Sequence, residues 1–188
     1  AGGQTLLPAM KLRLNAPSKL IDLSKIAALR GVEVTSEGVS VGAMTPHNDV
    51  ATNAEVAKAI PGLSELAKLI GDPAVRHKGT IGGSIANNDP AADYPAVCLA
   101  LGATIATDRR EIKADDFFKG LFETALGEGE IITRVTFPRA EKSAYVKFRN
   151  PASRFALVGV FVAKTKSGAR VAVTGAGSDG VFRWKEAE

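Results

Sequence analysis

The sequence contains a single cysteine, few aromatic residues and no long apolar run, and each of these shortages excludes a class of protein. Cys98 alone cannot form an intrachain disulfide, a Cys₄ iron–sulfur site or a cysteine-rich zinc site. Aromatic residues make up only 6% of the chain, too few for the base-stacking platform of a single-strand nucleic-acid binder. No apolar run approaches the roughly 18 residues of a membrane-spanning helix. We therefore expect neither nucleic-acid binding nor a membrane span.

Charge and length are ordinary for a folded domain. The chain has 188 residues and a net charge of +4, and its basic residues are interspersed with acidic ones. This length suits one domain, or one domain and part of another. The scarcity of cysteine favours a reducing, cytoplasmic setting. Because the chain begins with Ala1 inside a glycine loop and stops in a charged stretch, we expect that residues of the natural protein are missing at both ends.

The first part of the chain shows mixed helix and strand patterns. A β-hairpin is expected over residues 31–42, with Glu37-Gly38 as its turn, and a brief strand over residues 20–23. Apolar residues at i, i+3, i+4 and i+7 predict an amphipathic helix over residues 63–70. Thr45-Pro46 is interpreted as a helix N-cap followed by proline at the first helical position. The other expected helices cover residues 6–14 and 96–101.

The last part of the chain is mainly β in character. Residues 131–137 form the clearest strand, which Pro138 ends. Three more strands are expected over residues 143–148, 156–163 and 169–174. This change places a boundary near residues 139–142. We thus divide the chain into one domain over residues 1–138 and a second over residues 142–188.

The most informative stretch is the glycine-rich segment Lys78-Gly79-Thr80-Ile81-Gly82-Gly83-Ser84. Adjacent glycines reach φ > 0 and turn several N–H groups toward one point, so that an anion approaches closely. Thr80 and Ser84 add hydroxyl donors, and the basic residues at 76–78 add positive potential. The chain opens with a similar pair of glycines in Ala1-Gly2-Gly3-Gln4-Thr5. Two such loops predict a clamp for one diphosphate.

Asp93, ten residues after Gly83, is suited to a ribose diol because a carboxylate accepts two hydrogen bonds. A simpler interpretation is that Gly82-Gly83 is a tight turn and that Asp93 is the N-cap of the following helix. The central motif alone leaves both interpretations open. The second glycine pair, at Gly2-Gly3, favours the diphosphate.

Other candidate residues carry weaker signals. Lys147 shares a strand face with Tyr145 and has the length to reach a polar ring edge of a cofactor, although a solvated lysine is commoner on a strand. His47 and His77 lack a third ligand at a metal spacing, so neither is assigned to a metal. The G-x-G-x-x-G at residues 175–180 follows a strand, but the helix and acidic residue of a dinucleotide site do not follow it. We interpret it as a turn.

Both glycine loops resemble the FAD-binding medium subunit of molybdenum hydroxylases, the group that includes the flavoprotein subunits of carbon monoxide dehydrogenase and xanthine dehydrogenase. The resemblance rests on residues 1–8 (AGGQTLLP), 80–87 (TIGGSIAN) and 89–95 (DPAADYP), and it continues through 129–132 and 144–147. It implies an α+β, two-subdomain FAD-binding fold of vanillyl-alcohol oxidase (PCMH-like) type. A partial C-terminal α+β domain would follow.

By position, the resemblance also implies which residues hold FAD. The two loops would cradle the pyrophosphate, and Asp93 would hold the ribose on the adenosine side. Ile132 would pack near the flavin, and Lys147 would approach the isoalloxazine edge. The implied cofactor-binding residues are Ala1, Gly2, Gly3, Gln4, Thr5, Thr80, Ile81, Gly82, Gly83, Ser84, Asp93, Ile132 and Lys147.

The function implied by the resemblance is electron transfer within an oxidoreductase of several subunits. A molybdenum cofactor on a large subunit would oxidise the substrate, and [2Fe–2S] clusters on a small subunit would pass electrons to FAD on this chain. The acceptor would be NAD⁺, a quinone or oxygen. The residues themselves leave two alternatives, which are a stand-alone FAD-dependent oxidase or dehydrogenase and a cofactor-free interaction domain whose glycine pairs are only turns.

Overall fold

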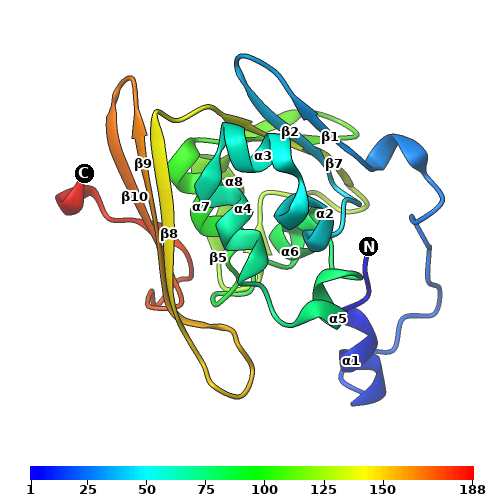
Figure 1. Cartoon of the computed structure of the whole chain (residues 1–188). Coiled ribbons are helices and arrows are strands. Elements are labelled where there is room, and N and C mark those ends of the chain that lie inside the picture. Colours follow the sequence, from blue (N-terminus) through cyan, green and yellow to red (C-terminus); the bar gives the residue numbers. More distant parts are fainter.

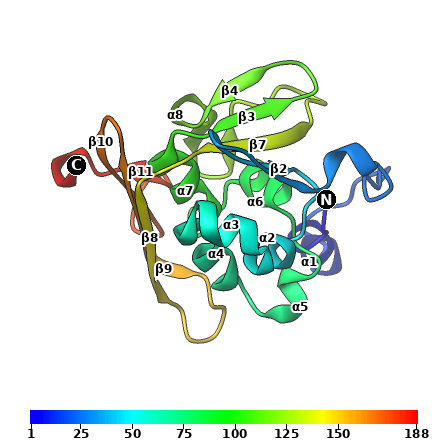
Figure 2. The ribbon, with the colours of Figure 1, turned by 45° about the horizontal axis from the view of Figure 1, so that its top comes forward.

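The computed structural model describes residues 1–188 and shows a layer of helices between two antiparallel β-sheets (Figures 1 and 2). The first sheet has the order β1 (Val32–Val34), β2 (Gly38–Gly42), β7 (Ile132–Pro138), β3 (Thr104–Thr107), β4 (Glu111–Lys113). The second sheet has the order β11 (Phe182–Arg183), β10 (Gly168–Thr174), β9 (Ala156–Thr165), β8 (Lys142–Arg149). A small hairpin is formed by β5 (Phe118–Gly120) and β6 (Glu123–Thr124).

The helices are short and fill the space between the two sheets, and one of them packs against both sheets. The inner helices are α2 (His47–Thr52), α3 (Ala54–Ala59), α4 (Pro61–Lys68), α6 (Ile81–Asn87) and α7 (Tyr94–Leu101). The others are α1 (Leu6–Lys11), α5 (Pro73–Arg76), α8 (Ala114–Phe117) and the 3₁₀ turns Ala27–Leu29 and Lys185–Ala187. Every residue of α7 is buried, as expected for a helix with sheets on two sides. None of these helices has the length and apolar character needed to span a bilayer.

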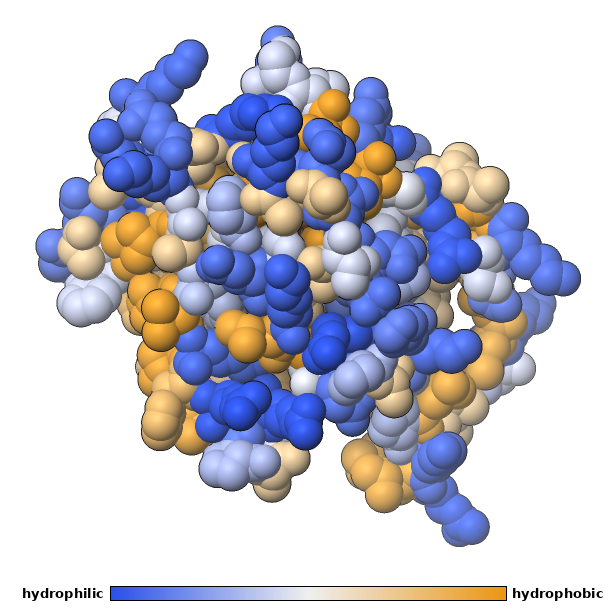
Figure 3. Space-filling view, in the orientation of Figure 1, coloured by the Kyte–Doolittle hydropathy of each residue, from blue (hydrophilic) through white to orange (hydrophobic).

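One hydrophobic core connects the two sheets through the helices. It contains Phe137 from β7, Tyr94 from α7 and Phe161 from β9, all of them inaccessible to solvent. The opposite face of the second sheet carries apolar residues in contact with solvent, and Val146 and Phe148 in β8 are 73% and 71% exposed. Apolar residues gather along this side of the molecule, at the left in Figure 3.

The strongly patterned elements lie where the sequence predicts them. The hairpin is β1–β2, the amphipathic helix is α4, and the four later strands are β7 to β10. The G-x-G-x-x-G segment is a turn that leads into β11, as predicted.

Two local predictions are wrong. Residues 20–23 are not a strand, because no neighbouring strand pairs with them, and Leu20 and Ile21 remain exposed. Thr45 does not cap α2, which begins at His47. The Thr45 hydroxyl instead donates a hydrogen bond to the carbonyl oxygen of Gly31, 3.0 Å away.

Candidate functional site

The two glycine loops lie against each other, so that the second loop, at residues 78–84, contacts the N-terminus of the chain. A Cβ atom added to Gly2 would lie 1.8 Å from the carbonyl oxygen of Lys78, so only glycine permits this approach. A Cβ atom on Gly83 would lie 3.1 Å from the Cβ atom of Ala1. The structure thus brings together the two segments that a diphosphate clamp requires, although they are about 80 residues apart in the sequence.

The first loop provides free backbone donors. No acceptor within the chain receives the N–H groups of Gly2, Gly3, Gln4 or Thr5, and the first bonded amide is that of Leu7, which donates to the carbonyl oxygen of Gly3 at 3.1 Å. Gly3 adopts a φ of +75°, which favours glycine. A run of unpaired N–H groups in such a turn is an anion-binding arrangement.

The second loop differs from the expected conformation. Gly82 and Gly83 do not have positive φ angles but form the first turn of α6, because Thr80 is the N-cap and its hydroxyl accepts from Gly83 N–H at 3.2 Å. Gly82 N–H donates to the carbonyl oxygen of Ala43 at 2.9 Å. These two amides are therefore occupied, and the prediction of φ > 0 at adjacent glycines is wrong for this loop.

The glycines of the second loop are instead required for close packing. A Cβ atom on Gly82 would lie 2.5 Å from the Cβ atom of Ala43, and one on Gly79 would lie 2.6 Å from Nε2 of His47. The hydroxyls of Thr5 and Ser84 make no hydrogen bond within the chain. They remain available to a ligand.

Ile132 lies behind the second loop, at the start of β7. Ala43 N–H donates to the carbonyl oxygen of Thr133 at 3.0 Å, and Ala43 in turn accepts from Gly82, so β7 and α6 are linked through one residue. The Ile132 side chain is buried in the core. Its predicted contact with the flavin remains a prediction.

Asp93 and Lys147 form a buried ion pair. Lys147 Nζ lies 2.9 Å from Asp93 Oδ2, and the two side chains are only 1% and 5% exposed. Lys147 Nζ also donates to the carbonyl oxygen of Leu69 at 3.0 Å, and the Tyr145 hydroxyl donates to Asp93 Oδ1 at 2.5 Å. A carboxylate, an ammonium group and a phenol are thus gathered between α4, α7 and β8.

This cluster corrects three interpretations of the sequence. Asp93 makes no side-chain cap at the start of α7, and Lys147 is not a solvated strand lysine. Nor can the pair serve opposite ends of an extended FAD, with Asp93 at the adenosine and Lys147 at the flavin, because the two side chains touch. Tyr145 shares the Lys147 face, as strand alternation predicts, and its bond to Asp93 is a contact that alternation alone does not predict.

The protonation of the cluster reflects its burial. Burial raises the pKa of the Asp93 carboxyl, while the Lys147 ammonium and the Tyr145 hydroxyl lower it. The pKa of Tyr145 is raised, first by burial and then by the Asp93 charge, so its hydroxyl keeps its proton.

A Cβ atom on Gly159 would lie 2.2 Å from the Tyr145 hydroxyl oxygen. Gly159 therefore makes room for the phenol to reach Asp93.

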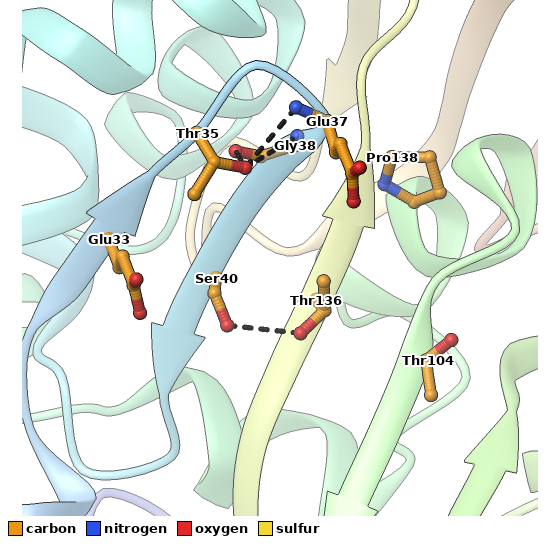
Figure 4. Close-up of a pocket in the computed structure, with 8 residues that line it drawn as sticks. All are labelled: Glu33, Thr35, Glu37, Gly38, Ser40, Thr104, Thr136 and Pro138. Carbon is orange, nitrogen blue, oxygen red and sulfur yellow. Dashed lines mark hydrogen bonds between the residues drawn. The ribbon is translucent and has the colours of Figure 1, made fainter.

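A separate cavity of about 360 Å³ lies on the outer face of the first sheet. Figure 4 shows polar side chains converging there, with the hydroxyls of Ser40 and Thr136 3.0 Å apart. Its lining residues are Glu33, Thr35, Glu37, Gly38, Ser40, Thr104, Thr136 and Pro138. None of them belongs to the glycine loops or to the Asp93 cluster.

Comparison with known proteins identifies the family. Residues 1–140 match the model for the FAD binding domain in molybdopterin dehydrogenase. The glyceraldehyde dehydrogenase medium chain of Sulfolobus acidocaldarius is 41% identical over 169 residues, which cover 87% of this chain and 60% of that protein. The carbon monoxide dehydrogenase medium chain of Hydrogenophaga pseudoflava is 41% identical over 175 residues, which cover 89% of this chain and 61% of that protein.

The fold comparison agrees with the sequence comparison. The structure of carbon monoxide dehydrogenase from Hydrogenophaga pseudoflava matches with a TM-score of 0.92 at 39% identity, over 100% of this chain and 69% of the matched chain. This similarity confirms the predicted α+β fold class. The chain spans about 60% of the length of the curated relatives that it matches. Residues 1–140 carry the family's FAD-binding domain, and the chain therefore belongs to the FAD-binding medium subunits of the molybdenum hydroxylases.

Proposed function

We propose that this protein is the FAD-binding, electron-transfer subunit of a molybdenum-containing oxidoreductase. The observation that carries the proposal is the free run of N–H groups from Gly2 to Thr5, held against the second glycine loop. FAD, when bound, supplies the redox chemistry. This chain's residues bind and orient it.

In this proposal the diphosphate is held mainly by the first loop. The N–H groups of Gly2, Gly3, Gln4 and Thr5 are unpaired donors, and the Thr5 hydroxyl is a fifth. From the second loop, Ser84 adds a free hydroxyl, and Gly82 and Gly83 contribute by letting the backbones approach. Hydrogen bonds from neutral donors to a charged phosphate are stronger than those between neutral groups.

We assign Asp93 and Lys147 to one region of the cofactor instead of two. An ammonium group has three N–H donors, and Lys147 uses two of them, on Asp93 and on Leu69. The third would donate to a polar atom of FAD, and because the Lys147 side chain is only 1% exposed, the bound cofactor would have to displace the groups that cover it. Asp93 then acts by holding the Lys147 ammonium in place, and Tyr145 holds Asp93.

The proposed partners follow from the family. Names of the relatives, such as "medium chain" and "FAD-subunit", describe one subunit of a larger enzyme. We propose that an iron–sulfur small subunit delivers electrons to FAD on this chain and that a large subunit carries the molybdenum cofactor. The electrons then leave to NAD⁺, a quinone or oxygen, and the complex works in the cytoplasm.

Purification of the full-length protein together with its partner subunits tests this function. We expect flavin absorbance in the complex, and reduction of the flavin by substrate only when the molybdenum and iron–sulfur subunits are present. Substrate reduction of the isolated flavoprotein would support the stand-alone oxidase instead. A complex without flavin would refute both flavin hypotheses and leave the interaction domain.

A variant in the second loop tests whether the glycine loops are the FAD site. Gly83→Val places a branched side chain where even a Cβ atom lies 3.0 Å from the Thr80 hydroxyl and 3.1 Å from Ala1. We expect FAD affinity to fall by about tenfold or more, the equivalent of one charge-assisted hydrogen bond. Ala86→Val, at an exposed position of the same helix, is the matched control. Equal FAD affinity in both variants would show that the FAD site does not include the second glycine loop.

A further inference from the structure

The outer face of the second sheet, turned away from the helices, carries three apolar rows that run across the strands. In two of these rows Val146 is paired with Val160 and Phe148 with Val158. Val146 and Phe148 are largely exposed, and Figure 3 shows apolar residues gathered along this side of the molecule. The register places the following further side chains in the rows: Ala144, Val162, Val171, Val173 and Phe182.

This composition does not suit a sheet face that meets water. An antiparallel sheet with one solvated face alternates apolar and polar residues along each strand. Strand β9 instead reads ALVGVFVA over residues 156–163, so it is apolar on both faces. Such continuous apolar runs are typical of strands that are buried on both sides. The helices and the core cover the inner side of the sheet, and the outer side calls for a second covering layer.

The charges at one end of the face indicate what the covering layer contains. Lys142 and Lys164 are directly opposite each other on β8 and β9, in the row that follows the apolar rows. Lys164 pairs with Glu141 at 3.0 Å, whereas Lys142 forms no ion pair within the chain. Like charges directly opposite each other on a sheet are destabilising. A carboxylate in the covering layer would relieve this repulsion, and a second copy of the same face supplies none at its strand positions.

The last residues of the chain lie at the edge of this sheet. Trp184 N–H donates to the carbonyl oxygen of Val171 at 2.9 Å, and Val171 N–H donates to a carboxylate oxygen of Glu188 at 3.0 Å. Figures 1 and 2 show this end beside β10, on the opposite side of the molecule from the amino terminus. Because the chain spans about 60% of the length of its relatives, a longer polypeptide has residues with which to cover the face.

We propose that, in the full-length protein, residues beyond Glu188 pack on the outer face of the second sheet as an amphipathic layer. Its apolar side covers Val146, Phe148 and their neighbours, and one of its acidic residues pairs with Lys142. A segment of the same polypeptide that starts at the sheet edge has a high effective concentration there, which favours it over a separate protein. The inference goes beyond the proposed FAD function and does not depend on it.

Thiol labelling of the isolated full-length protein tests whether the face is covered. Cys98 is buried, so an introduced surface cysteine is the one that reacts. We expect a maleimide to react with Val146→Cys at least about tenfold more slowly than with Glu111→Cys, because a covered thiol reacts only when the covering layer opens. Glu111 is the matched control, an exposed strand position in the first sheet.

Cross-linking tests which segment forms the cover. A carbodiimide joins an amine to a carboxylate in contact with it, and mass spectrometry should locate a link from Lys142 to a residue beyond Glu188. A Lys142 link found only within residues 1–188 would contradict the predicted acidic contact. As an independent measurement, Val146→Asp should lower the melting temperature of the full-length protein more than Glu111→Asn does, because only the first change introduces an unpaired charge into a covered face.

Each alternative cover has its own outcome. Equal labelling rates of the two cysteine variants in the isolated full-length protein would overturn the inference. Protection of Val146→Cys that appears only with added partner subunits would assign the face to another subunit, and protection only at high protein concentration would assign it to a second copy. Protection only with vesicles of phosphatidylserine and phosphatidylcholine would assign it to a membrane surface. Any of these three results would also overturn the inference.

Discussion

At the residue scale, the Asp93 carboxylate has a single counter-ion, the Lys147 ammonium, and both are buried. Removal of one member of such a pair leaves an uncompensated charge inside the protein. We expect Lys147→Met to lower the free energy of unfolding by about 3 kcal/mol at pH 7. Urea denaturation measures this loss. The double variant Asp93→Asn/Lys147→Met, which leaves no buried charge, should be more stable than Lys147→Met alone.

The pH dependence of this loss has a definite sign. Burial raises the pKa of Asp93, and loss of the opposing Lys147 charge raises it further. Folded Asp93 in the variant then keeps its proton at pH values where the unfolded chain has released it. Because the unfolded state binds fewer protons, the free energy of unfolding decreases as pH rises above about 4. The loss of unfolding free energy caused by Lys147→Met should therefore be small near pH 4 and reach its full value at pH 7. A loss that does not change with pH would contradict the assignment of Asp93 and Lys147 as a buried ion pair.

At the element scale, the register between β8 and β9 places Gly159 opposite Lys147 and beneath Tyr145. Gly159→Ala puts a methyl group 2.2 Å from the Tyr145 hydroxyl oxygen, so the ring must move away from Asp93. We expect a destabilisation of about 1–3 kcal/mol, typical of overpacking. The downfield hydroxyl proton resonance of a short Tyr145–Asp93 bond should also disappear.

A matched control for this substitution is Gly120→Ala. The nearest atom to a Cβ there is a carboxylate oxygen of Glu123 at 3.7 Å, an ordinary contact, and the φ angle of Gly120 is not positive. Its stability should remain within about 0.5 kcal/mol of the original protein, as for most surface substitutions. Equal losses in the two variants would show that the Tyr145 contact is not responsible.

The elements also show what sequence patterns reveal and what they do not. Period-2 alternation placed Tyr145 and Lys147 on one face of β8, because alternation is a property of the strand itself. It did not reveal Asp93 as their partner, which lies 52 and 54 residues away in the sequence. The apolar run at 20–23 resembles a strand, yet strands form only where another strand pairs with them. Gly82-Gly83 suggested φ > 0, but the Thr80 cap made them helical.

At the scale of the whole molecule, the hydrophobic core crosses the boundary predicted between residues 1–138 and 142–188. Tyr145, Phe161, Ala163 and Ala172 from the second sheet belong to the same cluster as the buried side chains of the first sheet. The Asp93–Lys147 pair crosses the same boundary. Shared burial of this kind favours a single cooperative unit, because neither part can open without exposing the other.

Phe161→Ala tests this cooperativity. Phe161 is fully buried in β9, and its ring contacts α4 so closely that a Cβ atom on Gly62 would lie 2.9 Å from its Cζ atom. Loss of the ring should lower the free energy of unfolding by about 3–5 kcal/mol. Amide hydrogen exchange should then accelerate by a similar factor in β2 and β7 of the first sheet and in β8 to β10 of the second. Acceleration confined to β8–β10 would show that residues 142–188 unfold as an independent domain, and that the Lys147 contact with Asp93 opens with them.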